Sequence, residues 1–332
     1  MSPPSPALAI PSELSPPVAP RAGEGSPAPR TSDTPAPAAV SPGASLLLAL
    51  FSVYVIWGST YLVMKIAVET WPPMLMGAVR FSIAGAILLV VGRVRLGRWP
   101  AAREWLAALP VGVLLFVVGN GFVAFAETEV SSGVAALVVA TMPLWMAMFG
   151  SVVGERLRAR EWAGIAIGVT GVVILVSGSE LSAAPVATLV LALAPLGWAL
   201  GSTIARRVPM APGLLGTATQ QLIGGVAMAA AGLAHGERWP ATMTFASVWT
   251  LAYLIVFGSL IAFTAYAWLL RNTRPAVATS SAFVNPPLAV LLGAALGSEA
   301  ISTQTLIATP VVIAAVVLVV GRPRPPAAAA TR

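Results

Sequence analysis

The sequence predicts an all-α membrane protein with ten transmembrane helices, formed by two inverted copies of a five-helix unit. Composition indicates an integral membrane protein, because 57% of the 332 residues are hydrophobic and only 9% are charged. Apolar runs of bilayer-crossing length follow one another along most of the chain. Residues of matching type recur in the two halves at an interval of roughly 140 residues, as internal repeats require.

The first 44 residues differ in composition from the rest of the chain. They are rich in proline, alanine and serine and cannot bury a hydrophobic core, so we expect residues 1–44 to form a disordered cytoplasmic tail. No basic segment leads into a short apolar run with a small-residue cleavage site. We therefore expect no cleaved signal peptide, and the first apolar run stays in the mature protein.

Ten apolar runs follow this tail, each with about the 17 to 25 residues that a transmembrane helix needs. The first five would make one repeat over residues 45–179, and the last five a second repeat over residues 185–321. Residues 322–332 would form a short cytoplasmic tail. The runs cover approximately residues 45–66, 74–92, 105–127, 131–153, 162–179, 185–205, 212–234, 247–270, 275–297 and 301–321.

Basic residues alternate between the two sides of the predicted membrane. Most of the 19 lysines and arginines fall in segments that are cytoplasmic if the N-terminus is cytoplasmic, while the opposite segments keep only Lys65 and Arg238. This asymmetry predicts that both termini lie in the cytoplasm. The net charge of +7 is then a topology signal at helix ends, so we expect contact with the lipid bilayer and none with nucleic acid.

Scarce residue types exclude several classes of protein. The chain has no cysteine and a single histidine, His235, so we expect no metal site, no haem and no other cofactor. The single lysine, Lys65, follows Met64 where a P-loop needs glycine, which excludes an ATP-driven pump on this polypeptide. The single aspartate, Asp33, lies in the tail. We therefore expect no catalytic residues and no enzymatic activity.

The two halves match around four landmarks. An odd number of crossings per repeat makes the second half enter the membrane from the opposite side, which predicts inverted repeats about an axis in the membrane plane. Rocking one half against the other would open a central cavity to each side in turn. The matching pairs are Trp57 with Trp198, Arg80 with Gln220, Gly119 with Gly258, and Pro143 with Pro286.

A proline interrupts the fourth and the ninth predicted helix. Pro143 and Pro286 each free a backbone carbonyl, and a proline in mid-helix bends the helix. In lipid, opened backbone is tolerated only where it faces protein or a water-filled cavity. We therefore expect both prolines to lie beside the central cavity and to take part in gating.

Several short motifs occur in order and at fitting distances. They are WGSTY at 57–61, WPP at 71–73 followed by Arg80 and Phe81, VGNG at 118–121, SSGVAAL at 131–137, ATMPLW at 140–145, GER at 154–156 and NPPLAVLLG at 285–293. From Ser45 to Gly321 the chain resembles the drug/metabolite transporter superfamily, and within it the EamA-type ten-helix exporters. The long tail and Pro287, where related sequences usually have an aliphatic residue, depart from this pattern.

This resemblance has implications for architecture and function. It implies a bacterial inner-membrane carrier built from two EamA repeats. It also implies a small-molecule substrate that is exported, often an amino acid or a toxic compound such as a drug.

Polar and aromatic residues inside the spans are candidates for the wall of the cavity, because a pocket for a mostly apolar metabolite needs a few placed polar groups. The alternative interpretation is packing by the tryptophans and hydrogen bonding between helices by the amides, worth about 0.6 kcal/mol on average. The candidate substrate-binding residues are Trp57, Thr60, Asn120, Trp145, Trp198, Gln220, Gln221, Phe263, Tyr266 and Asn285.

Charged residues near span ends are candidates for gating or coupling. Arg80 lies inside the second span, where an arginine costs about 2.5 to 3.5 kcal/mol near the centre. It either forms a structural ion pair with Glu127, at the same outer depth, or serves as a carboxylate-binding or gating residue. Glu155 and Glu299 end the fourth and ninth spans at opposite membrane faces and are interpreted as anchors or gates. The gating and coupling candidates are Arg80, Glu127, Pro143, Glu155, Pro286 and Glu299.

The leading functional hypothesis is a carrier that exports small metabolites by alternating access. An intramembrane lipid- or acyl-modifying enzyme is an alternative, which would have to work with Glu127, Arg80 and hydroxyl groups. A passive facilitator or channel is another.

Overall fold

The computed structural model describes residues 42–320, apart from residues 153, 155–156, 274–276 and 278–279. Nearly all of both predicted tails, and the gating candidate Glu155, lie outside the described residues. Helix α1 begins at Pro42, so residues 42–44 are helical although their composition assigns them to the N-terminal tail. A proline fits the first turn of a helix, because its missing N–H would have no helical partner there.

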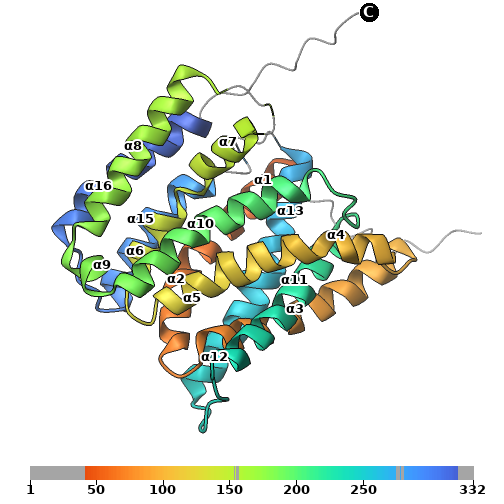
Figure 1. Ribbon diagram of the computed structural model, residues 1–332. Coiled ribbons are helices and arrows are strands. Elements are labelled where there is room, and N and C mark those ends of the chain that lie inside the picture. Colours follow the sequence, from red (N-terminus) through yellow and green to blue (C-terminus); the bar gives the residue numbers. More distant parts are fainter. Residues whose placement is uncertain (1–41, 153, 155–156, 274–276, 278–279, 321–332) are drawn as a thin grey trace, which may run out of the picture. The chain divides into compact units, whose positions relative to one another are not determined.

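All regular elements of the described residues are helices, and η marks three wide, π-helical segments among them (Figure 1). The first half contains α1 (Pro42–Phe51), η1 (Ser52–Ile56), α2 (Trp57–Val68), α3 (Pro73–Leu96), α4 (Ala102–Gly112), η2 (Val113–Gly121), α5 (Phe122–Ala126), α6 (Ser132–Val139), α7 (Met142–Val152) and α8 (Ala159–Val176). The second half contains α9 (Ser179–Ala183), α10 (Pro185–Ala205), α11 (Leu214–Ala234), α12 (Phe245–Tyr253), η3 (Leu254–Ile261), α13 (Ala262–Asn272), α15 (Ser281–Leu296) and α16 (Thr303–Val320).

Eight helical stretches of the described residues are long and apolar enough to cross a membrane. Helix α11 has 21 residues but is not among them, because Gln220 and Gln221 lower its mean hydropathy. Helix α15 is apolar but has only 16 residues. The eight stretches are Gly43–Val68, Pro73–Leu96, Ala102–Ala126, Ser132–Val152, Ala159–Val176, Pro185–Ala205, Phe245–Leu269 and Thr303–Val320.

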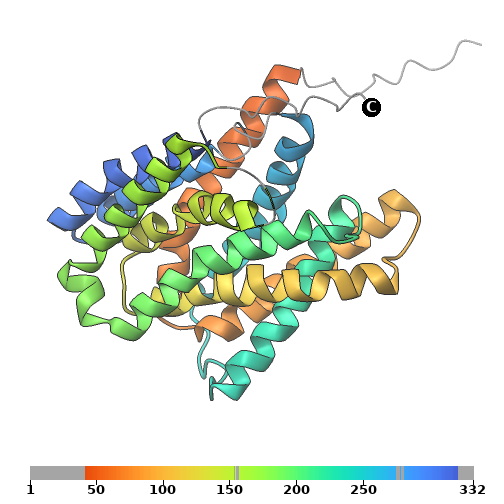
Figure 2. The ribbon, with the colours of Figure 1, turned by 45° about the horizontal axis from the view of Figure 1, so that its top comes forward.

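Helices that correspond in the two halves pack against each other. Helix α3 lies along α11, and α8 lies along α16 (Figures 1 and 2). Glycines allow this close approach. A Cβ on Gly225 would lie 2.8 Å from the backbone nitrogen of Ser82, and one on Gly164 would lie 2.8 Å from the carbonyl oxygen of Ala315. Each of the two contacts therefore brings backbones together where no side chain fits.

The third and eighth predicted spans both contain a wide turn. Segment η2 separates α4 from α5, and η3 separates α12 from α13. Gly119 and Gly258, which match in the sequence, lie in these two segments. Wide helical turns of this kind are frequent at functional sites. The two halves thus carry the same irregularity at corresponding positions.

The predicted interruptions at the prolines differ between the halves. Helix α6 ends at Val139 and α7 begins at Met142, so the fourth span is broken directly before Pro143. Helix α15 instead continues through Pro286 and Pro287. The broken span leaves backbone groups near Ala140 outside regular helix.

Large apolar side chains are exposed on several helices. Val94 is 78% exposed, Leu189 64% and Leu291 62%. Exposure of this kind on helices of bilayer-crossing length fits a surface that faces lipid, where apolar side chains lose nothing by being uncovered.

Candidate functional site

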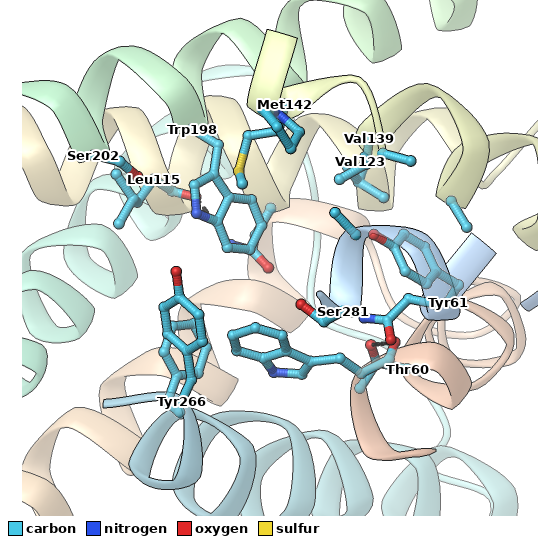
Figure 3. A pocket seen from close by; sticks show the side chains of 18 of the residues that line it. Thr60, Tyr61, Leu115, Val123, Val139, Met142, Trp198, Ser202, Tyr266 and Ser281 are labelled. Carbon is cyan, nitrogen blue, oxygen red and sulfur yellow. Dashed lines mark hydrogen bonds between the residues drawn. The ribbon is translucent and has the colours of Figure 1, made fainter. Parts of the chain in front are cut away.

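A cavity of about 550 Å³ lies between helices of both halves. Helices α2, α3, α5, α6 and α7 and the π-helical segment η2 line it from the first half, and α10, α11, α13 and α15 line it from the second. Figure 3 shows Tyr266 and Trp198 extending from different helices toward the same space, with Thr60 and Tyr61 at another side.

Aromatic rings form one wall of the cavity. The ring centroid of Trp57 lies 5.3 Å from that of Phe263 and 5.1 Å from that of Tyr266. The indole Nε1 of Trp57 donates a hydrogen bond to the Gly258 carbonyl at 3.3 Å, which joins α2 to η3. Trp198, the repeat mate of Trp57, also lines the cavity. Because these side chains come from both halves, the wall depends on how the halves are joined.

Amide side chains supply polar groups to the wall. The Nδ2 of Asn120 donates to the Leu115 carbonyl at 2.9 Å, within the wide turn η2. The Oδ1 of Asn285 is buried and has no hydrogen-bond partner in the described residues. A buried polar atom without a partner is unfavourable, so this oxygen is available to a donor that enters the cavity.

Arg80 lines the cavity from α3 and is only 4% exposed. Its Nε donates to the Ser259 hydroxyl on η3 at 2.8 Å, and its Nη1 lies 4.0 Å from the Met64 sulfur. Its guanidinium carbon is 4.6 Å from the ring centroid of Phe81. Ser259 also accepts, at its carbonyl, a hydrogen bond of 3.2 Å from Gln221. The π-helical segment η3 therefore binds the side chains of both Arg80 and Gln221.

The ion pair between Arg80 and Glu127, one of the two alternatives for Arg80, is not formed. Glu127 is fully buried, and neither of its carboxyl oxygens has a hydrogen-bond partner in the described residues. Lys65 binds the Glu127 backbone carbonyl instead, with an Nζ–O distance of 2.6 Å. The reason is geometric: the Arg80 side chain extends across to η3 and donates to Ser259 there.

Glutamates near the ends of two helices bind the N-termini of two others. Glu299 accepts hydrogen bonds from the Ser132 amide and hydroxyl, both at 2.9 Å, and from the Gly133 amide at 3.4 Å. Glu237 accepts from the amides of Met74 and Leu75 at 3.1 and 2.9 Å. A helix N-terminus favours a carboxylate. These contacts tie α6 and α3 of the first half to the second half.

The cavity wall includes most, but not all, of the residues predicted from the sequence. Trp145 is not on the wall. It precedes the wall residue Met146 in α7, and successive side chains of a helix point about 100° apart around the helix axis. Gln221 is fully buried behind the wall against Ser259. The predicted residues that do line the cavity are Trp57, Thr60, Arg80, Asn120, Pro143, Trp198, Gln220, Phe263, Tyr266, Asn285 and Pro286.

Several wall residues were not predicted from the sequence. Tyr61 and Met64 follow Trp57 by four and seven residues in α2, so the helical period from Trp57 contained the signal for both. Ser202 follows Trp198 by four residues in the same way. Arg206, which directly follows α10, comes eight residues after Trp198 and so continues the same helical period.

The fold and the cavity define a membrane transporter with internal repeats. Comparison with known proteins agrees: a family model described as "EamA-like transporter family" matches residues 44–177 and 186–321. The chain belongs to this family. It is a multi-pass protein of the inner membrane.

Individual known proteins are similar to this chain over most or part of its length. It is 44% identical over 272 residues to "Uncharacterized inner membrane transporter YedA" of Escherichia coli K12, covering 82% of this chain and 89% of the relative. It is 28% identical over 176 residues to "Probable amino-acid metabolite efflux pump" of the same organism, covering 49% and 53%. A solved structure described as "Crystal structure of protein" covers 84% of this chain and 96% of its own, with a TM-score of 0.57 and 23% identity, and shares the fold.

Proposed function

We propose that this protein exports small organic metabolites, amino acids or related compounds, by alternating access through the central cavity. The observation that carries the proposal is a cavity whose wall comes from corresponding helices of both halves. The broken span at Pro143 and the wide turn η2 border this cavity, as expected for a carrier whose binding site needs accessible backbone. The name of one relative, an amino-acid metabolite efflux pump, supports the substrate class and the direction.

We also propose that the chain crosses the membrane ten times. Helices α11 and α15 add two crossings to the eight long apolar stretches. An even number returns the C-terminus to the side of the N-terminus, as the arginine distribution requires. The first repeat then spans residues 45–179 and the second spans residues 185–321, with both tails in the cytoplasm.

In this orientation, we propose that the structure is an inward-facing state of the transport cycle. The cavity extends to Arg206 and Ser281, which lie at the predicted cytoplasmic ends of α10 and α15. At the opposite ends, Glu299 and Glu237 hold the N-termini of α6 and α3. Opening to the outside would require these contacts between the halves to separate, which gives Glu299 its role as a gate.

Counterflow in proteoliposomes tests the transport function. Vesicles that contain the purified protein and an excess of an unlabelled amino acid should take up the labelled compound faster than protein-free vesicles, and the rate should saturate. A panel of amino acids, peptides and acylated derivatives that gives no flux in either direction would contradict the proposal. Flux without saturation or counterflow would instead favour a channel, and turnover of an added lipid without flux would favour an enzyme.

A further inference from the structure

The charged side chains on the cavity wall are all cationic. Among the described residues that line the cavity, Arg80 and Arg206 are the charged ones, and none is acidic. Glu127 and Glu299 lie off the wall. A cavity with low-dielectric walls concentrates the field of its charges, so this one favours an anion over a cation.

Arg80 is buried without an acidic partner among the described residues. Among the described residues, only the Nε of Arg80 donates a hydrogen bond to an oxygen atom, that of the Ser259 hydroxyl. The contact between its Nη1 and the Met64 sulfur is weak. A guanidinium has five N–H donors and matches a carboxylate through two parallel hydrogen bonds. An ionisable residue at membrane depth needs a partner, and the oxygens of Glu127 do not supply one.

The wide turn η3 positions the guanidinium at the cavity. Ser259 accepts from its Nε, while Gly258 packs beside its Nη2, where a Cβ would come within 3.0 Å. The Gly258 carbonyl is held by the indole of Trp57. The Arg80 guanidinium and Trp57 of the aromatic wall are therefore held by neighbouring residues of η3, Ser259 and Gly258.

We propose that Arg80 is the anion-binding group of the transport site, and that the transported metabolite is an amphipathic carboxylate. Its acid group binds the Arg80 guanidinium, and its apolar body lies against Trp57, Trp198, Phe263 and Tyr266. The described residues of the wall offer no acidic group to an ammonium, so a simple carboxylate binds at least as well as the corresponding amino acid. This inference rests on the proposed transport function.

Three compounds that share one apolar body test the inference. The purified full-length protein in detergent is titrated with 3-phenylpropionate, 3-phenylpropanamide and 3-phenylpropylamine, and binding is followed by tryptophan fluorescence. We expect the carboxylate to bind about tenfold more tightly than the amide or the amine, the effect of one charge-assisted pair. Equal binding of the three, preference for the amine, or no binding of any of them would overturn the inference.

Variants assign the preference to Arg80. Arg80→Gln should bind the carboxylate and the amide equally, and Arg80→Lys should keep part of the preference. Arg238→Gln, which removes an exposed arginine far from the cavity wall, is the matched control and should bind as the parent does. A folded Arg80→Gln protein that retains the full preference would overturn the inference.

A second variant keeps the test decisive if Arg80→Gln does not fold. Ser259→Ala removes the hydroxyl that positions the guanidinium and should lower carboxylate affinity several-fold without changing amide affinity. An unchanged ratio of the two affinities would count against the inference. Flux of neutral compounds with no preference for carboxylates would overturn it while leaving the transport function intact, whereas absence of flux for every compound would overturn the transport function.

Discussion

Arg80 and Glu127 are buried residues of opposite formal charge that do not pair. Arg80 donates to Ser259 on the neighbouring segment η3, and the Glu127 carboxyl group has no hydrogen-bond partner in the described residues. Burying an ionised carboxylate without a hydrogen-bond partner is very unfavourable. The two residues therefore act separately: Arg80 faces the cavity, and Glu127 is packed behind it.

Glu127→Gln should leave stability nearly unchanged. Glutamine has the shape of the neutral acid, and no ion pair is lost, so we expect a change in the free energy of unfolding below about 1 kcal/mol. Removing one partner of a buried ion pair would cost about 3 to 5 kcal/mol. Thermal unfolding of the purified variant in detergent, beside the parent protein, distinguishes the two cases. A strong loss of stability would mean that Glu127 has a partner after all.

Asn120→Leu and Asn285→Leu should reduce flux while the protein still folds. Both amides line the cavity, and the loss of one hydrogen bond to a substrate worth about 1.4 kcal/mol corresponds to a tenfold lower rate. Asn285→Leu also removes a buried oxygen that has no hydrogen-bond partner among the described residues, so the stability of this variant should not fall. Counterflow in proteoliposomes measures the flux of each variant, and thermal unfolding measures its stability. Thr170→Val, at an exposed position of α8, is the control, and unchanged flux in both asparagine variants would exclude them from the site.

At the scale of elements, the N-termini of α3 and α6 are held by carboxylates from the other half. Three hydrogen bonds join Glu299 to the first turn of α6, and two join Glu237 to the first turn of α3. The helix dipole adds to each contact because an N-terminus is partly positive. Each glutamate thus compensates for its own place near a helix C-terminal end by binding the start of another helix.

Glu299→Ala should destabilise the protein and loosen its outer end. The loss of hydrogen bonds to a charged acceptor lowers the free energy of unfolding by about 2 kcal/mol. Thermal unfolding in detergent measures the loss. Glu69→Ala removes an exposed glutamate from the same predicted side and should have almost no effect. Equal stability of the two variants would show that the Glu299 contacts contribute little.

At the scale of the whole molecule, corresponding helices of the two halves face one cavity. Helices α3 and α11 contribute Arg80 and Gln220, and α2 and α10 contribute Trp57 and Trp198. The residues that pair in the sequence therefore meet around a shared space. In the proposed alternating-access cycle, moving one half relative to the other would change access to this space.

Cysteine labelling tests the orientation of the cavity. The chain has no cysteine, so Ser202→Cys places one thiol on the cavity wall without background. Without substrate, a membrane-impermeant maleimide should label it in inside-out vesicles and much more slowly in intact cells. Glu69→Cys, in the predicted outer segment, should show the opposite preference. Rapid labelling of Ser202→Cys from outside would contradict an inward-facing cavity.

Sequence by itself determined the class of protein, the family and much of the cavity wall. Composition and the lengths of apolar runs are properties of the chain that do not depend on packing, so they predict a helical membrane protein directly. The repeat interval and the prolines point to the helices around the cavity. Eight of the ten candidate substrate-binding residues line it. For the amides the reason is that polar residues inside apolar spans are unfavourable unless they face protein or water.

Only the tertiary structure decided which face of each helix meets the cavity and which groups bind each other. Lipid and the protein interior are both apolar, so hydropathy does not reveal the rotation of a helix. Trp145 and Gln221, two of the predicted substrate-binding residues, do not lie on the cavity wall. Arg80 binds Ser259, 179 residues away, rather than Glu127 on the next span. Such partners are chosen by the distance between helices in space, which depends on packing across the two halves.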